Sequence, residues 1–477
     1  MRRTTVVAVV LVCASGALCA DAVTKWTRSP GDPGDWFAAE NWSNGVPTTT
    51  VFRRIEAYVE NGGTCRISQA GANTGFLYLT NGEIEQTGGS LLVREMENGS
   101  GSCTIGQAGR YRMVDGDVEF SRLVVDGDFV QTGGHVDIDY YFGVPDLQIG
   151  GAYELRSGSL ISNWTTIRKD GILLQTGGMA DLDTMDIQGT FRLESGTTTA
   201  ITDAHVSGNV YWNSDQPYGC ALVNVDVVDG GEFYHAGGET GGVNFTIRPG
   251  GSYTLAAGSL NYGCGEILGK LTICDGTGMI RFSELAIGPG ADLDIPPGTS
   301  ITTHVVHVYG GRGSISGLEN LTLRLMGVNW PSEIEAWSCP SSIKEEQTVL
   351  GGITLGDDGP VDAVITNYWN ANEIVGESEQ VVLTKYLTIQ EGSVLDLNGS
   401  AIWVRGDVTD LLDGYVADGR IIDSTHSFPS LHSVYWPNVN WTIVPEPATL
   451  SLLALLALSL PKRGGLTLLR RKSGCGG

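Results

Sequence analysis

The sequence has few charged residues, few basic residues and little proline, and each shortage excludes a class of protein. Only 17% of its 477 residues are charged, and 29 Lys and Arg stand against 54 Asp and Glu, a net charge of −25. A general nucleic-acid-binding protein needs a basic face for phosphate, so no nucleic-acid partner is expected. With 17 prolines, and glycines that follow no three-residue period, the chain is not collagen. Its 41% of hydrophobic residues excludes wholesale disorder.

The nine cysteines include no Cys-x-x-Cys pair, so a zinc site is not supported. No cofactor is expected. Six of the nine cysteines lie outside the terminal segments: Cys65, Cys103, Cys220, Cys264, Cys274 and Cys339. An even set of cysteines in an exported protein permits disulfides in many pairings. The separation of ten residues makes Cys264 and Cys274 the first candidate pair.

The first residues have the order of a secretory signal peptide. Arg2 and Arg3 precede an apolar run over residues 6–12, and Ala20-Asp21-Ala22 offers a small-x-small cleavage site. We expect residues 1–22 to be removed, with the mature chain starting near Val23. The alternative is a lipoprotein signal that uses Cys19.

The last residues, 444–477, combine a short motif, an apolar run and a basic end. The motif is Val444-Pro445-Glu446-Pro447, the run covers residues 448–460, and the basic residues are Lys462, Arg463, Arg470, Arg471 and Lys472. This order resembles the PEP-CTERM sorting signal. The resemblance implies transient anchoring in a membrane, basic residues on the cytoplasmic side, and an exosortase-like enzyme that cuts near Pro447. The run is shorter than the about 20 residues of a spanning helix, and an ordinary hydrophobic tail is the alternative.

Glycines punctuate the middle of the chain at a regular interval. The sequence motif Gly-Asp-Phe-Val-Gln-Thr-Gly at residues 127–133 recurs along the chain, in closer and looser copies. The second glycine of each copy marks a series from Gly88 to Gly298, which has ten steps of about 21 residues if the long interval from Gly196 to Gly237 counts as two. Apolar and polar residues alternate between the glycines, which indicates strands. We therefore predict an all-β fold, a parallel β-helix or β-solenoid of about 21-residue coils, with glycine at the corners. The alternative takes each Gln-Thr-Gly-Gly as a hairpin turn in an antiparallel meander or barrel.

The rhythm divides the chain into segments. The Trp-rich stretch 23–63, with Trp36 and Trp42, resembles the opening of secreted, glycine-rich, autotransporter-like β-solenoid proteins and is expected to cap the first coil. Residues 64–329 should form the solenoid repeats, and 330–380, with fewer glycines, an insertion or a second lobe. Residues 381–443 should form closing coils and a cap.

Few residues suggest chemistry, and no catalytic residue or metal site is predicted. Asp137 with Asp139, and Asp181 with Asp183, should share a strand face and bind calcium weakly at most, a solvated acidic exterior being favoured. His304 and His307 are expected on opposite faces of a strand, in structural roles. Aromatic residues that could stack on sugars, if exposed, are Tyr140, Tyr141, Phe142, Tyr211 and Trp212. Packing is the favoured role for them.

These features predict an exported structural or adhesive protein of the cell surface or of an exopolysaccharide matrix, and not an enzyme. In the PEP-CTERM family, the sorting tail goes with Gram-negative bacteria that export polysaccharide, which makes extracellular polysaccharide an expected partner. The alternative is a polysaccharide-acting β-helix enzyme, a lyase or glycosidase. Against it, the Gly-His-Gly and Arg-Ile-Lys signatures of polygalacturonase-like enzymes are absent. A protein that only forms surface layers, without a ligand, is a third possibility.

Overall fold

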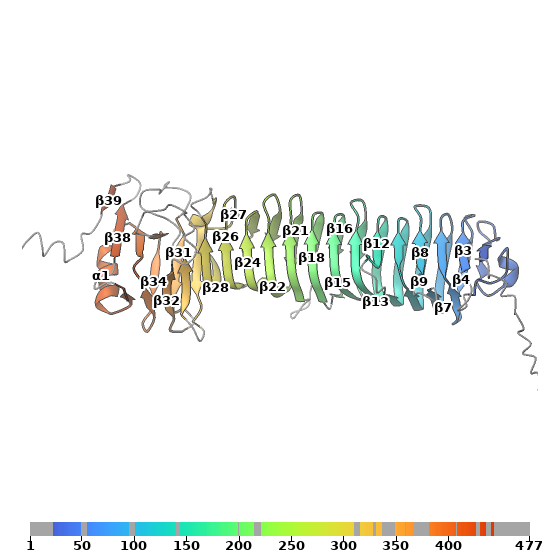
Figure 1. The fold of residues 1–477 in the computed structure, drawn as a ribbon, viewed down its shortest axis with the longest axis horizontal. Helices are drawn as coiled ribbons and strands as arrows, with labels where there is room; N and C mark the ends of the chain where they lie inside the picture. Colours follow the sequence, from blue (N-terminus) through green and yellow to red (C-terminus); the bar gives the residue numbers. More distant parts are fainter. Residues whose placement is uncertain are drawn as a thin grey trace, which may run out of the picture.

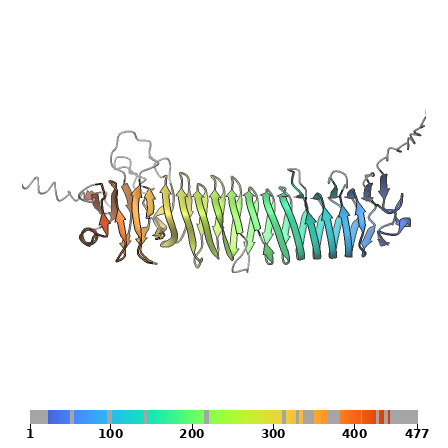
Figure 2. The same cartoon turned by 60° about the horizontal axis from the view of Figure 1, so that its bottom comes forward.

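The chain winds into a long parallel β-solenoid of about 15 turns (Figure 1). It is 61% strand and 4% helix, and at a coil spacing of about 4.8 Å the turns rise roughly 70 Å. A computed structural model describes residues 22–48, 55–94, 101–139, 144–198, 200–213, 221–309, 315–327, 331–335, 349–357, 359–366, 381–406, 408–425, 430–435 and 440–442. Figure 2 shows the same stack of coils from another side.

Each regular coil carries three short strand stretches, here called ladders A, B and C in chain order. Ladder A contains β2 (Gly34–Asp35), β4 (Thr64–Ile67), the first parts of β7 (Glu83–Val93), β9 (Arg110–Phe120), β11 (Asp128–Ile138) and β13 (Ala152–Ile167), then β14 (Ile172–Gln175), β16 (Thr190–Leu193), β19 (Asn209–Asn213), β21 (Glu232–Gly237), β23 (Ser252–Leu255), β25 (Lys270–Ile273) and β27 (Asp292–Asp294).

Ladder B takes the later parts of β7, β9 and β11 and the middle of β13, with β5 (Ala72–Thr74) before them. It goes on through β15 (Met179–Ile187), β17 (Thr197–Thr198), β18 (Ala200–Val206), β20 (Ala221–Val227), β22 (Glu239–Ile247), β24 (Ser259–Ile267), β26 (Ile280–Ile287), β28 (Thr299–Val308), β29 (Leu321–Leu325), β31 (Gly352–Leu355) and β34 (Leu387–Ile389). A 3-10 turn, η3 (Leu318–Asn320), precedes β29.

Ladder C begins with β1 (Ala22–Lys25), β3 (Ile55–Val59), β6 (Phe76–Leu79), β8 (Ser102–Ile105), β10 (Leu123–Val125) and β12 (Leu147–Ile149). It continues in the last parts of β13, β15, β18, β20, β22, β24, β26 and β28, and then in β30 (Ser332–Glu335), β32 (Asp362–Thr366), β35 (Val394–Asp396) and β37 (Ile421–Ile422).

The strand pairs of this 35-stranded sheet are parallel, which excludes the antiparallel meander. Eleven register steps along ladder A lead from Thr64 to Asp292, an average of about 21 residues per coil, within the range of solenoid repeats. The predicted coil length is therefore confirmed. The long interval between Gly196 and Gly237 contains β19, the extra coil that the repeat requires.

Alternating side chains point into one continuous core. In β11, for example, Phe129, Gln131, Val136 and Ile138 are buried, and the residues between them are not. Aromatic rings stack from coil to coil inside: the centroids of Tyr111 and Phe129 lie 4.8 Å apart, and those of Phe129 and Tyr153 4.5 Å apart.

A buried glutamine lies in every second coil over the first part of the rod. Gln86, Gln131 and Gln175 are buried at the end of the ladder A stretch, with Met113 and Leu155 in the coils between them. Each glutamine Oε1 accepts a hydrogen bond from a hydroxyl of the next coil, and the donors are Tyr111, Tyr153 and Thr198. The amide of Gln131 also donates to Ser159 O of the next coil, at 2.9 Å. These bonds satisfy polar groups that would be costly to bury alone.

Glycine lines the corner between ladders A and B. Gly134 and Gly158 have φ angles of 74° and 87°, a left-handed conformation that L side chains rarely adopt. A Cβ on Gly158 would lie 2.2 Å from the carbonyl oxygen of Gly134 in the preceding coil, and a Cβ on Gly134 would lie 2.4 Å from that of Gly116. The coils stack closely here because no side chain intervenes, as predicted.

The N-terminal end of the core is covered by three tryptophans. Trp26, Trp36 and Trp42 are buried and pack edge to face, with both ring-centroid distances at 5.0 Å. The 3-10 turn η1 (Ala39–Asn41) leads into Trp42, whose Nε1 donates to the carbonyl oxygen of Trp36 at 2.8 Å. The three residues belong to the stretch 23–63 that the sequence predicted to cap the first coil. Figure 1 shows the N-terminal segment of the chain at one end of the rod.

The C-terminal end has a small second sheet and a helix. The sheet holds β33 (Val381–Thr384), β36 (Ala401–Arg405), β38 (Ser430–Tyr435) and β39 (Asn440–Thr442), and its last two strands are antiparallel. Helix α1 (Thr409–Ala417) adds Leu412 and Tyr415 to the core. The described strands of residues 330–380, β30, β31 and β32, continue the solenoid, where the sequence predicted an insertion or a second lobe.

The predicted terminal signals fall almost wholly outside the described residues. Of the expected signal peptide only Ala22 is described, and the sorting tail 444–477 is not. Within the described part of the chain, no helix is long and apolar enough to cross a membrane.

Candidate functional site

The structure does not form the expected disulfide. Cys264 and Cys274 are both free thiols, as are the buried Cys65 and Cys103. A separation of ten residues is about half a coil. Cys264 therefore lies in ladder C, aligned with Asn244 and Glu284, whereas Cys274 follows the ladder A strand β25. Cys220 and Cys339 lie outside the described residues.

The two aspartate pairs lie on the outside of the rod. Asp137 and Asp139 flank the buried Ile138, and Asp181 and Asp183 flank the buried Leu182. Asp139 accepts a hydrogen bond from Asn163 of the next coil, and Asp183 accepts one from Thr202. Among the described residues, no group of three or more His, Cys, Asp and Glu side chains lies close enough to hold a metal ion.

The predicted aromatic pair is split between core and surface. Trp212 is fully buried, and Tyr211 lies on the outer side of ladder A. The ring of Tyr211 stacks on that of Tyr234 of the next coil, at 5.6 Å and 8°, while the guanidinium of Arg192 in the preceding coil lies 5.1 Å from its centroid. Both faces of Tyr211 are thus occupied, so this residue offers no free face to a sugar. Tyr140, Tyr141 and Phe142 lie outside the described residues.

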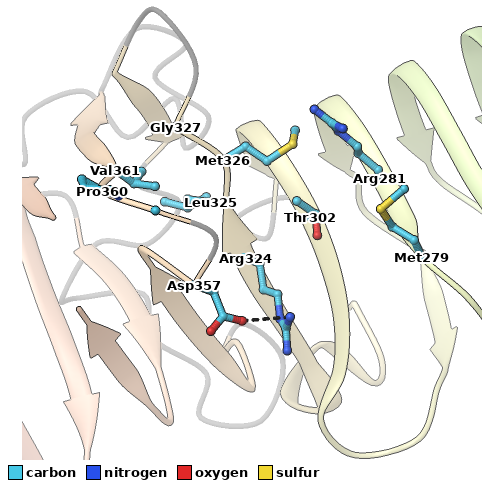
Figure 3. A pocket seen from close by; sticks show the side chains of 11 residues that line it. Met279, Arg281, Thr302, Arg324, Leu325, Met326, Gly327, Asp357, Pro360 and Val361 are labelled. Carbon is cyan, nitrogen blue, oxygen red and sulfur yellow. Dashed lines mark ion pairs between the residues drawn. The ribbon is translucent and has the colours of Figure 1, made fainter. Parts of the chain in front are cut away.

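A cleft of about 290 Å³ opens on the side of the rod where the coils lengthen. Thr302, the register partner of Arg281, follows it by one ordinary coil. Gly352, the register partner of Thr322, follows it by an ordinary coil and almost half a coil more. The cleft is lined by polar and apolar residues of four successive chain segments: Met279, Arg281, Thr302, Arg324, Leu325, Met326, Gly327, Asp357, Gly359, Pro360 and Val361 (Figure 3).

Two arginines and a threonine follow one another along the cleft. Arg281, Thr302 and Arg324 are register partners on β26, β28 and β29, with Thr302 in the middle (Figure 3). Arg324 pairs with Asp357 at 2.8 Å. Within the described part of the chain, Arg281 makes no ion pair. The sequence contained a signal for this row, since one coil length separates each member from the next, but it is visible only once the coil register is known.

A second polar cluster surrounds His307 at the outer side of ladder C. Its Nδ1 lies 2.7 Å from Glu335 Oε2, and its Nε2 lies 3.4 Å from Glu284 Oε1. Glu335 is 1% exposed, and its Oε1 has no hydrogen-bond partner among the described residues. The hydrogen bond to Glu335 raises the pKa of His307 above its ordinary value, because it favours the charged imidazolium.

His304 does not share this cluster. Its Nδ1 lies 3.2 Å from the carbonyl oxygen of Met326. The alternation of β28 breaks between Thr303 and Val306, both buried, so His304 and His307 face outward on either side of a corner and not on opposite faces of one strand.

The sorting motif Val444 to Pro447 and the basic residues of the tail lie outside the described residues. Comparison of the chain with known protein families, with curated proteins and with solved structures found no match in any of the three.

Proposed function

We propose that the protein is an exported structural or adhesive component of the cell surface or of an exopolysaccharide matrix. The observation that carries this proposal is the rod itself: about 15 turns share one continuous core, and both ends are covered. Parallel ladders along the whole length make such a rod stiff, and covered ends hinder end-to-end pairing of strands. A stiff, acidic rod suits a mechanical or spacing role outside the cell.

Sorting of the protein depends on the two ends of the chain in this proposal. The signal peptide would direct export, and the PEP-CTERM-like tail would hold the protein in the membrane until an exosortase-like enzyme cuts near Pro447. Mass spectrometry of the surface or secreted form tests this step. A C-terminus near Pro447 is expected, and an intact C-terminus at Gly477 would contradict sorting by cleavage.

The variant Glu446→Ala changes the sorting motif. Its product should therefore accumulate uncut in the membrane. The control Glu391→Ala changes an exposed glutamate on the body of the rod and should be processed normally. Equal processing of both variants would refute the role of the motif.

The His307 cluster supports a second candidate function, that of a polysaccharide-acting enzyme. Histidine and glutamate are side chains that commonly transfer protons in catalysis, and His307 lies within 3.4 Å of both Glu284 and Glu335. Incubation of the full-length protein with acidic and neutral polysaccharides separates the two functions. Release of sugars or of new unsaturated ends, abolished in His307→Asn, would favour the enzyme, and retention without turnover the matrix role.

A further inference from the structure

We propose that the cleft between Arg281 and Asp357 binds a carboxylate-bearing stretch of an anionic polysaccharide, a chain of uronic acids. This inference rests on the proposed matrix role and adds to it the chemical class of the ligand and the place where it binds.

The charge of the cleft is the first argument. On the outside of this acidic rod, arginines are mostly neutralised, as in the pairs Arg110–Asp128, Arg168–Asp126 and Arg248–Asp226. Arg281 is half-buried and, within the described residues, has no carboxylate partner. A guanidinium has five N–H donors that match a carboxylate in a planar, two-bond geometry. Arg281 is therefore the residue that a ligand carboxylate would contact.

The Arg324–Asp357 pair supplies a different kind of contact. The pair is neutral as a whole, and Gln390 Nε2 donates to the other oxygen of Asp357 at 3.2 Å. Guanidinium N–H groups that the pair leaves unused can donate to ring or glycosidic oxygens, and the carboxylate can accept from sugar hydroxyls. Thr302 offers a further hydroxyl between the two arginines.

The walls of the cleft suit the apolar C–H face of a sugar ring. Met279, which is 51% exposed, and Met326 border the Arg281 end, and Pro360 and Val361 border the other (Figure 3). Methionine adapts its shape to the surface packed against it. The volume of the cleft, about 290 Å³, is near the lower limit for ligand pockets, roughly 300 Å³. A cleft of this size would hold only about one or two sugar units of the chain at a time.

The geometry of the row favours a chain over a single anion. Arg281 and Arg324 lie two coils apart, roughly 10 Å along the rod, with Thr302 between them. A linear oligosaccharide that runs parallel to the rod would contact both in sequence.

Binding to the purified full-length protein, by titration calorimetry, tests the proposal. The probes are a uronic-acid hexamer, the same hexamer with its carboxylates reduced to alcohols, and citrate. The wild type should bind the acidic hexamer, with an affinity that falls as salt rises, and bind the reduced hexamer and citrate at least about tenfold more weakly. Equal affinity for citrate would overturn the polysaccharide ligand in favour of a small-anion site.

The variant Arg281→Gln should weaken binding of the acidic hexamer at least about tenfold, because hydrogen bonds to a charged group are lost. The matched control is Arg248→Gln, which removes an outer arginine paired with Asp226 away from the cleft. Circular dichroism confirms that both variants fold. Undiminished binding by Arg281→Gln, or equal losses in both variants, would refute the cleft as the site.

The outcomes also separate this inference from the proposed function. If Arg281→Gln binds uronate normally while the protein is still retained in the matrix, the cleft is refuted and the matrix role stands. If the wild type binds uronate as expected but never reaches the surface, the matrix role is refuted and the binding site stands.

Discussion

Replacing Gly158 with alanine should destabilise the rod far more than the same replacement at Gly276. Both glycines have positive φ: 87° at Gly158, at the corner inside β13, and 81° at Gly276, in the turn between β25 and β26. At Gly276 the space around an added Cβ is empty within 4 Å, whereas at Gly158 the Cβ would lie 2.2 Å from Gly134 O and 2.8 Å from Gly133 C. The comparison therefore separates backbone strain from coil stacking.

The magnitudes follow from these two terms. Left-handed backbone costs an alanine about 1–2 kcal/mol, and this is the whole expected loss for Gly276→Ala. For Gly158→Ala, overlap with rigid backbone must push neighbouring coils apart, which adds about 1–3 kcal/mol by analogy with overpacked cores. The expected difference between the two variants is thus about 1–3 kcal/mol.

Urea unfolding monitored by circular dichroism measures the difference. Because each coil contacts only its neighbours, Gly158→Ala should also broaden the transition or divide it in two, and hydrogen exchange should rise first in coils beside Gly158. A loss for Gly158→Ala no larger than that for Gly276→Ala would refute the role of the glycine corner in stacking.

Three further predictions concern buried polar groups. Tyr153→Phe leaves Gln131 Oε1 without its hydroxyl donor at 2.8 Å and should lower the free energy of unfolding by about 1–3 kcal/mol. The loss should be smaller in a chain that already carries Gln131→Leu. Additive losses in a double-mutant cycle would contradict the pairing. Burial lowers the pKa of His235 to about 4, so the unfolded chain takes up its proton first and stability should fall by about 3 kcal/mol from pH 6.5 to pH 4. His235→Gln should remove this dependence in urea titrations, and an unchanged slope would rule out His235 as its source. The sign is opposite for His307: its pKa is raised by Glu335, so its stabilising contribution is present below pH 6.5 and is lost as pH rises through the folded pKa, a decline that should vanish in His307→Asn.

The architecture could be predicted from the sequence because its cause is local and repeated. The alternation of apolar and polar residues between the glycines determines which side chains face inward. Because the same sequence motif recurs once per coil, each strand lies beside the equivalent strands of the coils before and after it. Insertions such as residues 214–220, which fall between β19 and β20, leave the register of the following coils unchanged.

The candidate site could not be predicted in the same way. Arg281, Arg324 and Asp357 come together only through the register of β26, β28 and β29 and through the longer coils that follow. The disulfide prediction failed for a related reason. The prediction paired the two cysteines by their separation along the chain, whereas the position of each residue around the coil decides whether two side chains meet. Cys264 and Cys274 are half a coil apart and lie on different ladders.

The alternation of the buried glutamines constrains how the rod can change length. If the coil that begins at Ala152 were deleted, Leu173 would replace Tyr153 above Gln131, and the glutamine would lose its hydroxyl donor. If two coils were deleted together, the coil that contains Thr198 would follow, and a donor would return. In this part of the molecule, length variants should therefore differ by pairs of coils, in increments of roughly 10 Å.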